Sequence, residues 1–141
     1  MHQKAIIALG LLALASAGTA RADEGATISK RLEAANYTVV SLEPDRGPKP
    51  VKSFYVVADY TSKHAFAFYV YTYRDHATAE RAETGDYVWL DTYGTPGASQ
   101  LEVDGRVLYW GATGPMNHGS GPNPTLPPAR FRRMVALARG G

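Results

Sequence analysis

Apolar residues recur along the chain with two different periods, which separate the predicted helices from the predicted strands. Near the start, an i, i+4, i+7 spacing predicts a short amphipathic helix over residues 27–35, with Thr27 as its N-cap and Asn36 as its C-cap. The β-branched segment 37–42 predicts a strand, which ends at the Pro- and Gly-rich stretch 43–50.

The strongest hairpin signal lies in residues 53–60 and 64–74, two runs of strand-forming residues separated by the polar turn 61–63. Successive side chains of a strand point to opposite faces of a sheet. The second strand therefore places Phe66, Phe68 and Val70 on one face and Tyr69, Tyr71 and Tyr73 on the other.

A polar segment with helical character follows this hairpin. Asp75 is the expected N-cap of a helix over residues 76–84. Gly85 is expected to end that helix, because glycine tolerates the left-handed conformation that a C-terminal cap requires. A short strand over residues 87–91 comes next.

Asp104-Gly105 stands between two further apolar runs and predicts a type I′ hairpin, which needs positive φ at both central residues. A two-residue loop pairs Val103 with Arg106, Leu101 with Leu108, and Ser99 with Trp110. The faces follow from this register: Leu101, Val103, Leu108 and Trp110 are expected on a buried face, and Gln100, Glu102, Val107 and Tyr109 on a wet one.

The C-terminal part combines a long Gly/Pro-rich loop at 111–128 with a last helix that begins at Pro127 and Pro128 and stops at Gly140. The apolar stripe of this last helix consists of Phe131, Met134, Val135 and Ala138. Together the elements predict an α+β domain: an antiparallel sheet of about five to six strands built from hairpins, with two or three helices packed on one face.

The first 22 residues have the three parts of a secretory signal peptide. Lys4 provides the positive region, residues 5–17 are apolar, and small residues precede the expected cleavage between Ala22 and Asp23. The apolar run is shorter than the roughly 20 residues of a membrane span, and no second long apolar run follows. We therefore expect one exported domain over residues 23–141, secreted or periplasmic, with no transmembrane segment after cleavage.

Cleavage also changes the charge. The full chain of 141 residues has 15 basic and 13 acidic residues, and the signal peptide removes two basic ones, so the mature domain is formally neutral. Neutrality argues against nucleic acid as a partner. The charges are segregated: residues 75–104 contain seven acidic side chains and one arginine, whereas residues 105–141 contain five arginines and no acid. The two segments face each other, are solvated separately, or form a polarised surface that orients a charged partner.

Candidate chemistry is sparse, because the chain has no cysteine and no known spacing of metal ligands. Met116, Asn117 and His118 lie in the long loop, where a thioether and an imidazole two residues apart suit copper. His64 or His76 would complete such a site; a solvated loop histidine is the competing interpretation. A small hydrolase with a spatially assembled site is a second alternative, although Ser120 lacks the G-x-S-x-G context.

Tyrosine is abundant, with nine residues in the chain. Tyr69, Tyr71 and Tyr73 form a row that suits a protein or carbohydrate interface, or else packs half-buried beneath a helix. The sequence therefore favours a non-enzymatic binding protein of the cell envelope or extracellular space, without a cofactor unless copper is bound. The expected partner is a protein or a glycan, held by the 111–126 loop with Tyr109 and Trp110 beside it.

Overall fold

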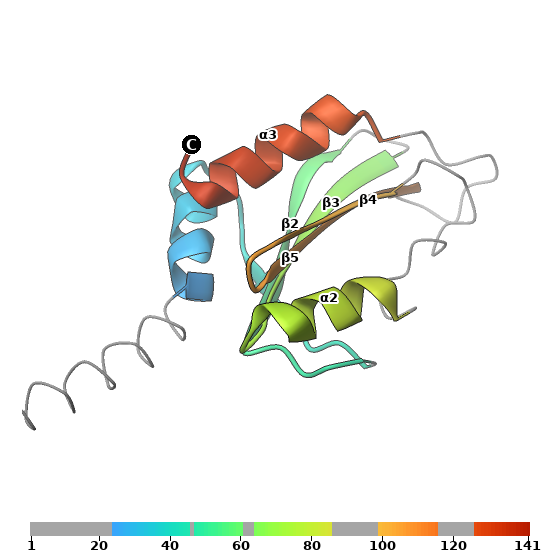
Figure 1. Ribbon diagram of the computed structural model, residues 1–141. Helices are drawn as coiled ribbons and strands as arrows, with labels where there is room; N and C mark the ends of the chain where they lie inside the picture. Colours follow the sequence, from blue (N-terminus) through green and yellow to red (C-terminus); the bar gives the residue numbers. More distant parts are fainter. Residues whose placement is uncertain (1–23, 46, 61–63, 86–98, 116–125) are drawn as a thin grey trace, which may run out of the picture.

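A computed structural model describes residues 24–45, 47–60, 64–85, 99–115 and 126–141. Its strands form one five-stranded antiparallel sheet in the order β1-β2-β3-β5-β4 (Figure 1). The strands are β1 (Val40–Ser41), β2 (Lys52–Tyr60), β3 (His64–Thr72), β4 (Ser99–Asp104) and β5 (Val107–Pro115). The described helices are a first helix over residues 24–34, α2 (His76–Thr84) and α3 (Pro128–Arg139). The predicted α+β class is confirmed.

The sheet lies between helices, with α3 above it and α2 below it in the view of Figure 1. The first helix and α3 pack on the same face and enclose the main core, which includes Leu32, Phe54, Phe66, Phe68, Val70, Tyr109, Leu126 and Phe131. Two helices on one face agree with the prediction. The third, α2, covers part of the opposite face, which we call the aromatic face; its cluster includes Tyr71, Tyr73, Leu108 and Trp110.

The first helix begins earlier than predicted, because residues 24–26 are already helical, so Thr27 lies inside the helix and is not its N-cap. The predicted C-cap is confirmed: Asn36 has a φ of 71°. Of the predicted strand 37–42, only β1 is paired. Tyr37 and Val39 pack instead against the main core.

The alternation predicted for β3 is confirmed, since Phe66, Phe68 and Val70 lie in the main core and Tyr71 and Tyr73 in the aromatic face. The predicted register of the second hairpin is wrong. Asp104 pairs with Val107, and Leu101 with Trp110, so the two-residue turn is Gly105-Arg106. Of these two turn residues only Gly105 has a positive φ (61°), as a type II′ turn requires.

The wet face predicted for this hairpin is also wrong on β5. Val107 and Tyr109 are each 2% exposed and belong to the main core. The reason is the position of β5 between β3 and β4, where helices cover both of its faces. The predicted loop likewise starts too early, because residues 111–115 extend β5 and pair with β3. Residues 116–125 and the predicted strand 87–91 lie outside the described residues.

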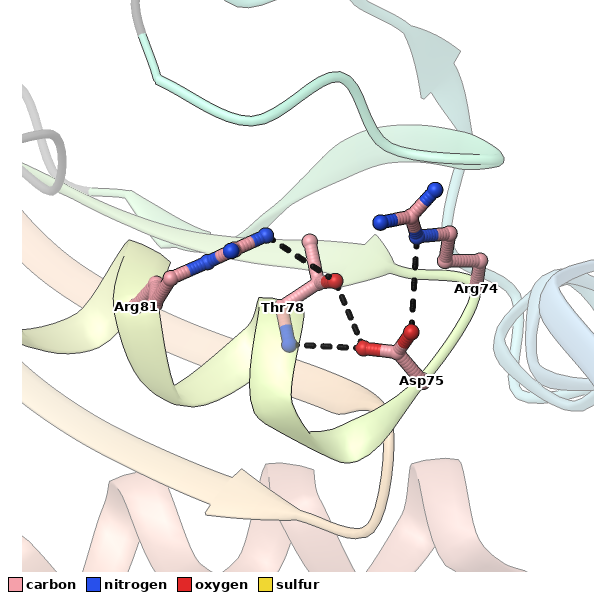
Figure 2. A network of polar contacts seen from close by, with 4 residues as sticks. All are labelled: Arg74, Asp75, Thr78 and Arg81. Atoms are coloured by element: carbon pink, nitrogen blue, oxygen red, sulfur yellow. Dashed lines mark hydrogen bonds and ion pairs between the residues drawn. The ribbon is translucent and has the colours of Figure 1, made fainter.

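α2 has the predicted bounds, whereas α3 begins at Pro128 and Pro127 is its extended N-cap, not part of the first turn as predicted. Asp75 caps α2: one of its carboxylate oxygens accepts hydrogen bonds from the Thr78 backbone N–H at 2.8 Å and the Thr78 hydroxyl at 2.6 Å (Figure 2). Gly85 ends α2 with a φ of −102°, so the expected left-handed conformation is wrong there. Gly140, with a φ of 86°, ends α3 as expected. No helix in the described part of the chain has the length and apolarity of a membrane span.

Candidate functional site

The residues predicted to form a contact surface are divided between the two faces of the sheet. Tyr69, Tyr71, Tyr73 and Trp110 share the aromatic face. Tyr109, the neighbour of Trp110 in β5, points into the main core. Met116, Asn117, His118, Ala22 and Asp23 lie outside the described residues, and the proposals that concern them stay predictions.

Three rings make a row across the aromatic face. Strand pairing places Tyr55 of β2 opposite Tyr69 of β3, and Tyr69 opposite Trp110 of β5. The ring centroids of Tyr55 and Tyr69 are 5.4 Å apart, and those of Tyr69 and Trp110 are 4.5 Å apart. Directly opposed side chains on neighbouring strands stabilise a sheet, and contacts between aromatic rings add to this effect. Tyr69 is thus held in a fixed position between two rings.

One end of the aromatic face is closed by α2, which packs on β4 and β5. Ala79 and Ala82 provide its contact surface, and their small side chains leave room for Tyr71 and Tyr73 beneath the helix. Burial raises the pKa of both phenols, that of Tyr73 to about 12. The buried Tyr71 hydroxyl has no hydrogen-bond partner among the described residues. Partner contact through either ring would require α2 to move.

The other end of the aromatic face, on β1, β2 and β3, is open with respect to the described helices. Val40 is 39% exposed and Val57 is 45% exposed, and both lie on the face of Tyr55. Tyr55, Ala67 and Tyr69 between them are half-buried. We call these five residues the apolar patch. Apolar side chains gathered on one open surface mark a contact site more often than scattered ones do.

Tyr55, Val40 and Val57 are not among the contact residues predicted from the sequence. The missed signal was the period of two in β2, which places Tyr55 and Val57 together on one face. The pairing of β1 with β2 then adds Val40, opposite Tyr55. That pairing joins segments on either side of a loop, so the local pattern did not reveal it.

The structure also separates the histidines. His64 begins β3, and its backbone is paired with that of Pro115, the residue before Met116. His76 lies near the other end of the sheet, where Nδ1–H donates to the carbonyl oxygen of Gly105 and Nε2 lies 2.9 Å from a carboxylate oxygen of Glu80. These two contacts raise the pKa of His76. Among the described residues, no three His, Cys, Asp or Glu side chains form a group that could hold a metal ion.

Tyr109 and several charged side chains line a cleft on the main-core side of the sheet. Here Arg139, from the acid-free C-terminal segment, lies with Nε 2.9 Å from a carboxylate oxygen of Asp104 in the acidic segment. This contact is of the kind expected if the two oppositely charged segments face each other. Neither this cleft nor a second one in the loop before β2 has a histidine in its lining.

Comparison with known proteins provides no family assignment. No protein-family model matches the chain, and neither the curated proteins nor the solved structures contain a significant match. The function is therefore inferred from the geometry of this molecule.

Proposed function

We propose that the protein is an exported, non-enzymatic binding protein of the cell envelope or extracellular space, and that the apolar patch forms its contact surface together with the loop that follows β5. The observation that carries this proposal is the open, apolar end of the aromatic face, with two exposed valines beside two tyrosines whose rings are in contact. Tyrosine suits recognition because it combines a large apolar ring with a polar tip and few rotatable bonds.

The composition of the apolar patch favours a protein over a glycan. Its side chains are valine, alanine and tyrosine, so its only side-chain polar groups are two phenol hydroxyls. A glycan site needs several precisely placed hydrogen-bonding groups for the sugar hydroxyls, whereas the centre of a protein interface is apolar and rich in aromatic residues. The expected partner therefore presents an apolar surface of its own.

Strand pairing also relates the patch to the long loop. Ala67 of the patch is paired with Ala112, three residues before the end of β5 at Pro115. The patch thus extends toward the end of the sheet at which β5 ends. This proximity supports a contact surface that combines the patch with the loop.

The experiment uses the mature protein as bait for the native envelope fraction, with two matched valine variants. Val57→Asp puts a charge in the patch, and Val51→Asp puts the same charge on a valine that is 51% exposed but lies outside the patch. We expect V57D to lose the captured partner and V51D to retain it. The partner is then identified by mass spectrometry, purified, and titrated against both variants by calorimetry.

A third variant tests the loop. Deletion of residues 116–122 avoids Gly114 and Pro115, which pair with β3, and we expect weaker capture with unchanged circular dichroism. Equal capture by V57D, V51D and the deletion variant would contradict the proposal. Capture that survives protease treatment of the envelope fraction would identify a glycan instead. The export part is tested separately, by N-terminal sequencing of the mature protein, which we expect to begin at Asp23.

A copper-binding function is the second candidate, and the pairing of His64 with Pro115 favours it. This pairing brings the backbone of His64 next to the residue that precedes Met116, whereas His76 lies near the opposite end of the sheet. Methionine sulfur and histidine nitrogen suit copper. We expect His64→Asn, Met116→Leu and His118→Asn each to weaken Cu(I) binding in a chelator competition, with His76→Asn as the unaffected control. No affinity, or an equal loss in H76N, would eliminate this candidate.

A further inference from the structure

A second candidate site lies on the main-core side of the sheet, opposite the apolar patch. It is a cleft of about 530 Å³ whose lining comes from the first helix, the β4–β5 hairpin and the last turn of α3. Figure 1 shows how these three elements are arranged. Its volume lies within the range of small-molecule sites, roughly 300 to 1,000 Å³. Three arginines and two acidic residues contribute to its lining, so the cleft carries excess positive charge.

Two of the arginines are neutralised by carboxylates. Arg106, in the β4–β5 turn, forms an ion pair with Glu24 of the first helix. Arg139, in the last turn of α3, pairs with Asp104. These two contacts join all three elements that surround the cleft, and they use both acidic groups of its lining.

The third arginine is not neutralised in this way. Arg31 of the first helix donates a hydrogen bond from Nη1 to the carbonyl oxygen of Ala138 at 2.8 Å. Its guanidinium also lies against Gly140, where an added Cβ atom would come within 3.0 Å of Arg31 Cζ. Within the described part of the chain, no carboxylate pairs with Arg31. A guanidinium has five N–H groups in a planar fork, which leaves donors for a ligand with two acceptor oxygens.

The remaining lining adds a neutral donor and an apolar wall. Tyr109 stacks against Phe68 in the main core with a centroid distance of 5.8 Å, and its phenol is close enough to Asp104 and Arg139 to be influenced by their charges. Burial, with Asp104 adding to it, raises the pKa of Tyr109 to about 12, so the hydroxyl keeps its proton at neutral pH. Ile28, Val107 and Ala138 provide apolar surface in the same cleft.

We propose that this cleft binds a small organic carboxylate that carries an apolar group, with the Arg31 guanidinium as its main contact. The fork geometry of arginine matches a carboxylate, and the apolar wall accommodates the rest of the ligand. The site is separate from the apolar patch, because the two lie on opposite faces of the sheet.

The binding experiment titrates the mature protein with N-acetyl-leucine, phenylacetate and hexanoate by NMR. N-acetyl-leucinamide serves as the uncharged control, and inorganic phosphate as the anion without an apolar group. We expect saturable shifts at residues of the cleft for the carboxylates and none for the amide. The proposal is contradicted if no carboxylate binds, if the amide binds equally, or if phosphate alone binds.

Matched variants then locate the bound anion. Thr27 lines the cleft and is exposed, and its hydroxyl forms no hydrogen bond with the described residues, so its replacement removes no side-chain hydrogen bond. Thr27→Glu places a negative charge beside the ligand, and Thr27→Gln has the same size without the charge. We expect T27E to weaken carboxylate binding by about tenfold and T27Q by less than about twofold.

Arg31 itself is tested with Arg31→Lys and Arg31→Gln, against Arg132→Gln on the exposed side of α3 as the control. We expect both Arg31 variants to lose binding and R132Q to retain it. If R31Q fails to fold, the T27E and T27Q pair still decides the question, and equal binding by these two variants would overturn the proposal. The patch variant V57D should bind the carboxylate normally, so this site and the proposed partner surface are tested independently.

Discussion

The two faces of the sheet differ in how completely helices cover them and in which side chains they carry. On the main-core face, the first helix and α3 enclose side chains such as Phe54, Phe68 and Val70, none of which is exposed. On the aromatic face, the nine-residue α2 covers β4 and β5 and leaves the patch around Tyr55 and Val57 open. Helices thus cover one face of this sheet more completely than the other.

Two neighbouring residues of β5 illustrate the difference between the two faces of the sheet. Gly111 points toward the main core, where an added Cβ atom would come within 2.7 Å of Phe131 and 2.9 Å of Phe66. Ala112 points to the other face, and its methyl group is accommodated there. The close approach of Phe131 to the sheet therefore depends on glycine at residue 111.

The largest expected effect is that of Phe68→Ala on the main-core face. Phe68 is not exposed and contacts the rings of Tyr109 and Phe131. Loss of the ring should lower the free energy of unfolding by about 3 to 5 kcal/mol. Tyr55→Ala on the aromatic face should lower the free energy of unfolding by clearly less, because Tyr55 is half-buried. Urea denaturation measures both values, and an equal loss would contradict the assignment of the faces.

A smaller loss is expected for Gly111→Ala, about 1 to 3 kcal/mol, because a methyl group must displace tightly packed rings. Gly105→Ala is the matched comparison. No atom lies within 4 Å of the Cβ position at Gly105, but its φ is 61°. Gly105→Ala should therefore lower the free energy of unfolding by about 1 to 2 kcal/mol, through backbone strain alone. Thermal unfolding measures the loss of stability in both variants. A crystal structure of G111A would show whether Phe131 moves.

High pH should destabilise both faces. Tyr73 on the aromatic face and Tyr109 on the main-core face each have a pKa raised from 10.0 to about 12. The unfolded chain therefore loses these protons first, so the stability from each neutral phenol is complete below pH 10 and is lost as the pH rises toward 12. Tyr73→Phe and Tyr109→Phe should each reduce this alkaline loss in urea titrations at pH 8 and pH 11. An unchanged pH dependence in both variants would exclude these two phenols as its source.

The smallest expected effect concerns the cap of α2, the helix that covers the aromatic face. Hydrogen bonds from Thr78, together with the nearby Arg74 and Arg81, lower the pKa of Asp75 below 3.8 (Figure 2). The stabilising effect of the carboxylate is therefore present above pH 3.8 and is lost as the pH falls below that value. Asp75→Ala should lower the melting temperature by a few degrees at pH 7 and by less at pH 3. An equal decrease at both pH values would show that the charge of the cap has no effect.

Sequence reasoning succeeded where the decisive interactions are local. The bounds of α2, its Asp75 cap and the left-handed Gly140 depend on residues within one helical turn. The hairpin at Gly105 is a case in which the local pattern predicted the wrong strand pairing. Its register is shifted by two residues, and because side chains alternate with a period of two, Leu101, Val103, Leu108 and Trp110 still share one face. The grouping of these four side chains was thus predicted correctly from a wrong pairing, whereas Val107 and Tyr109 on the opposite face are buried and not wet as expected.

The candidate sites were less predictable, because their residues come from distant parts of the chain. The cleft joins Arg31, Arg106 and Arg139, and the apolar patch joins Val40 to Tyr69 through β2. Tyr109 was expected beside a contact loop, yet its ring lies in the main core. No local period shows which strand becomes central, and that position decides whether a side chain meets water or a helix.

The sequence alone therefore determined the α+β class, the bounds of α2, the left-handed residues Asn36 and Gly140, and the alternation of side chains along the strands, because these depend on neighbours a few residues apart. The tertiary structure decided how much of each face is covered, which tyrosines are buried, and which arginines meet. Burial and charge pairing depend on the packing of segments up to about a hundred residues apart, as in the hydrogen bond between Arg31 and Ala138.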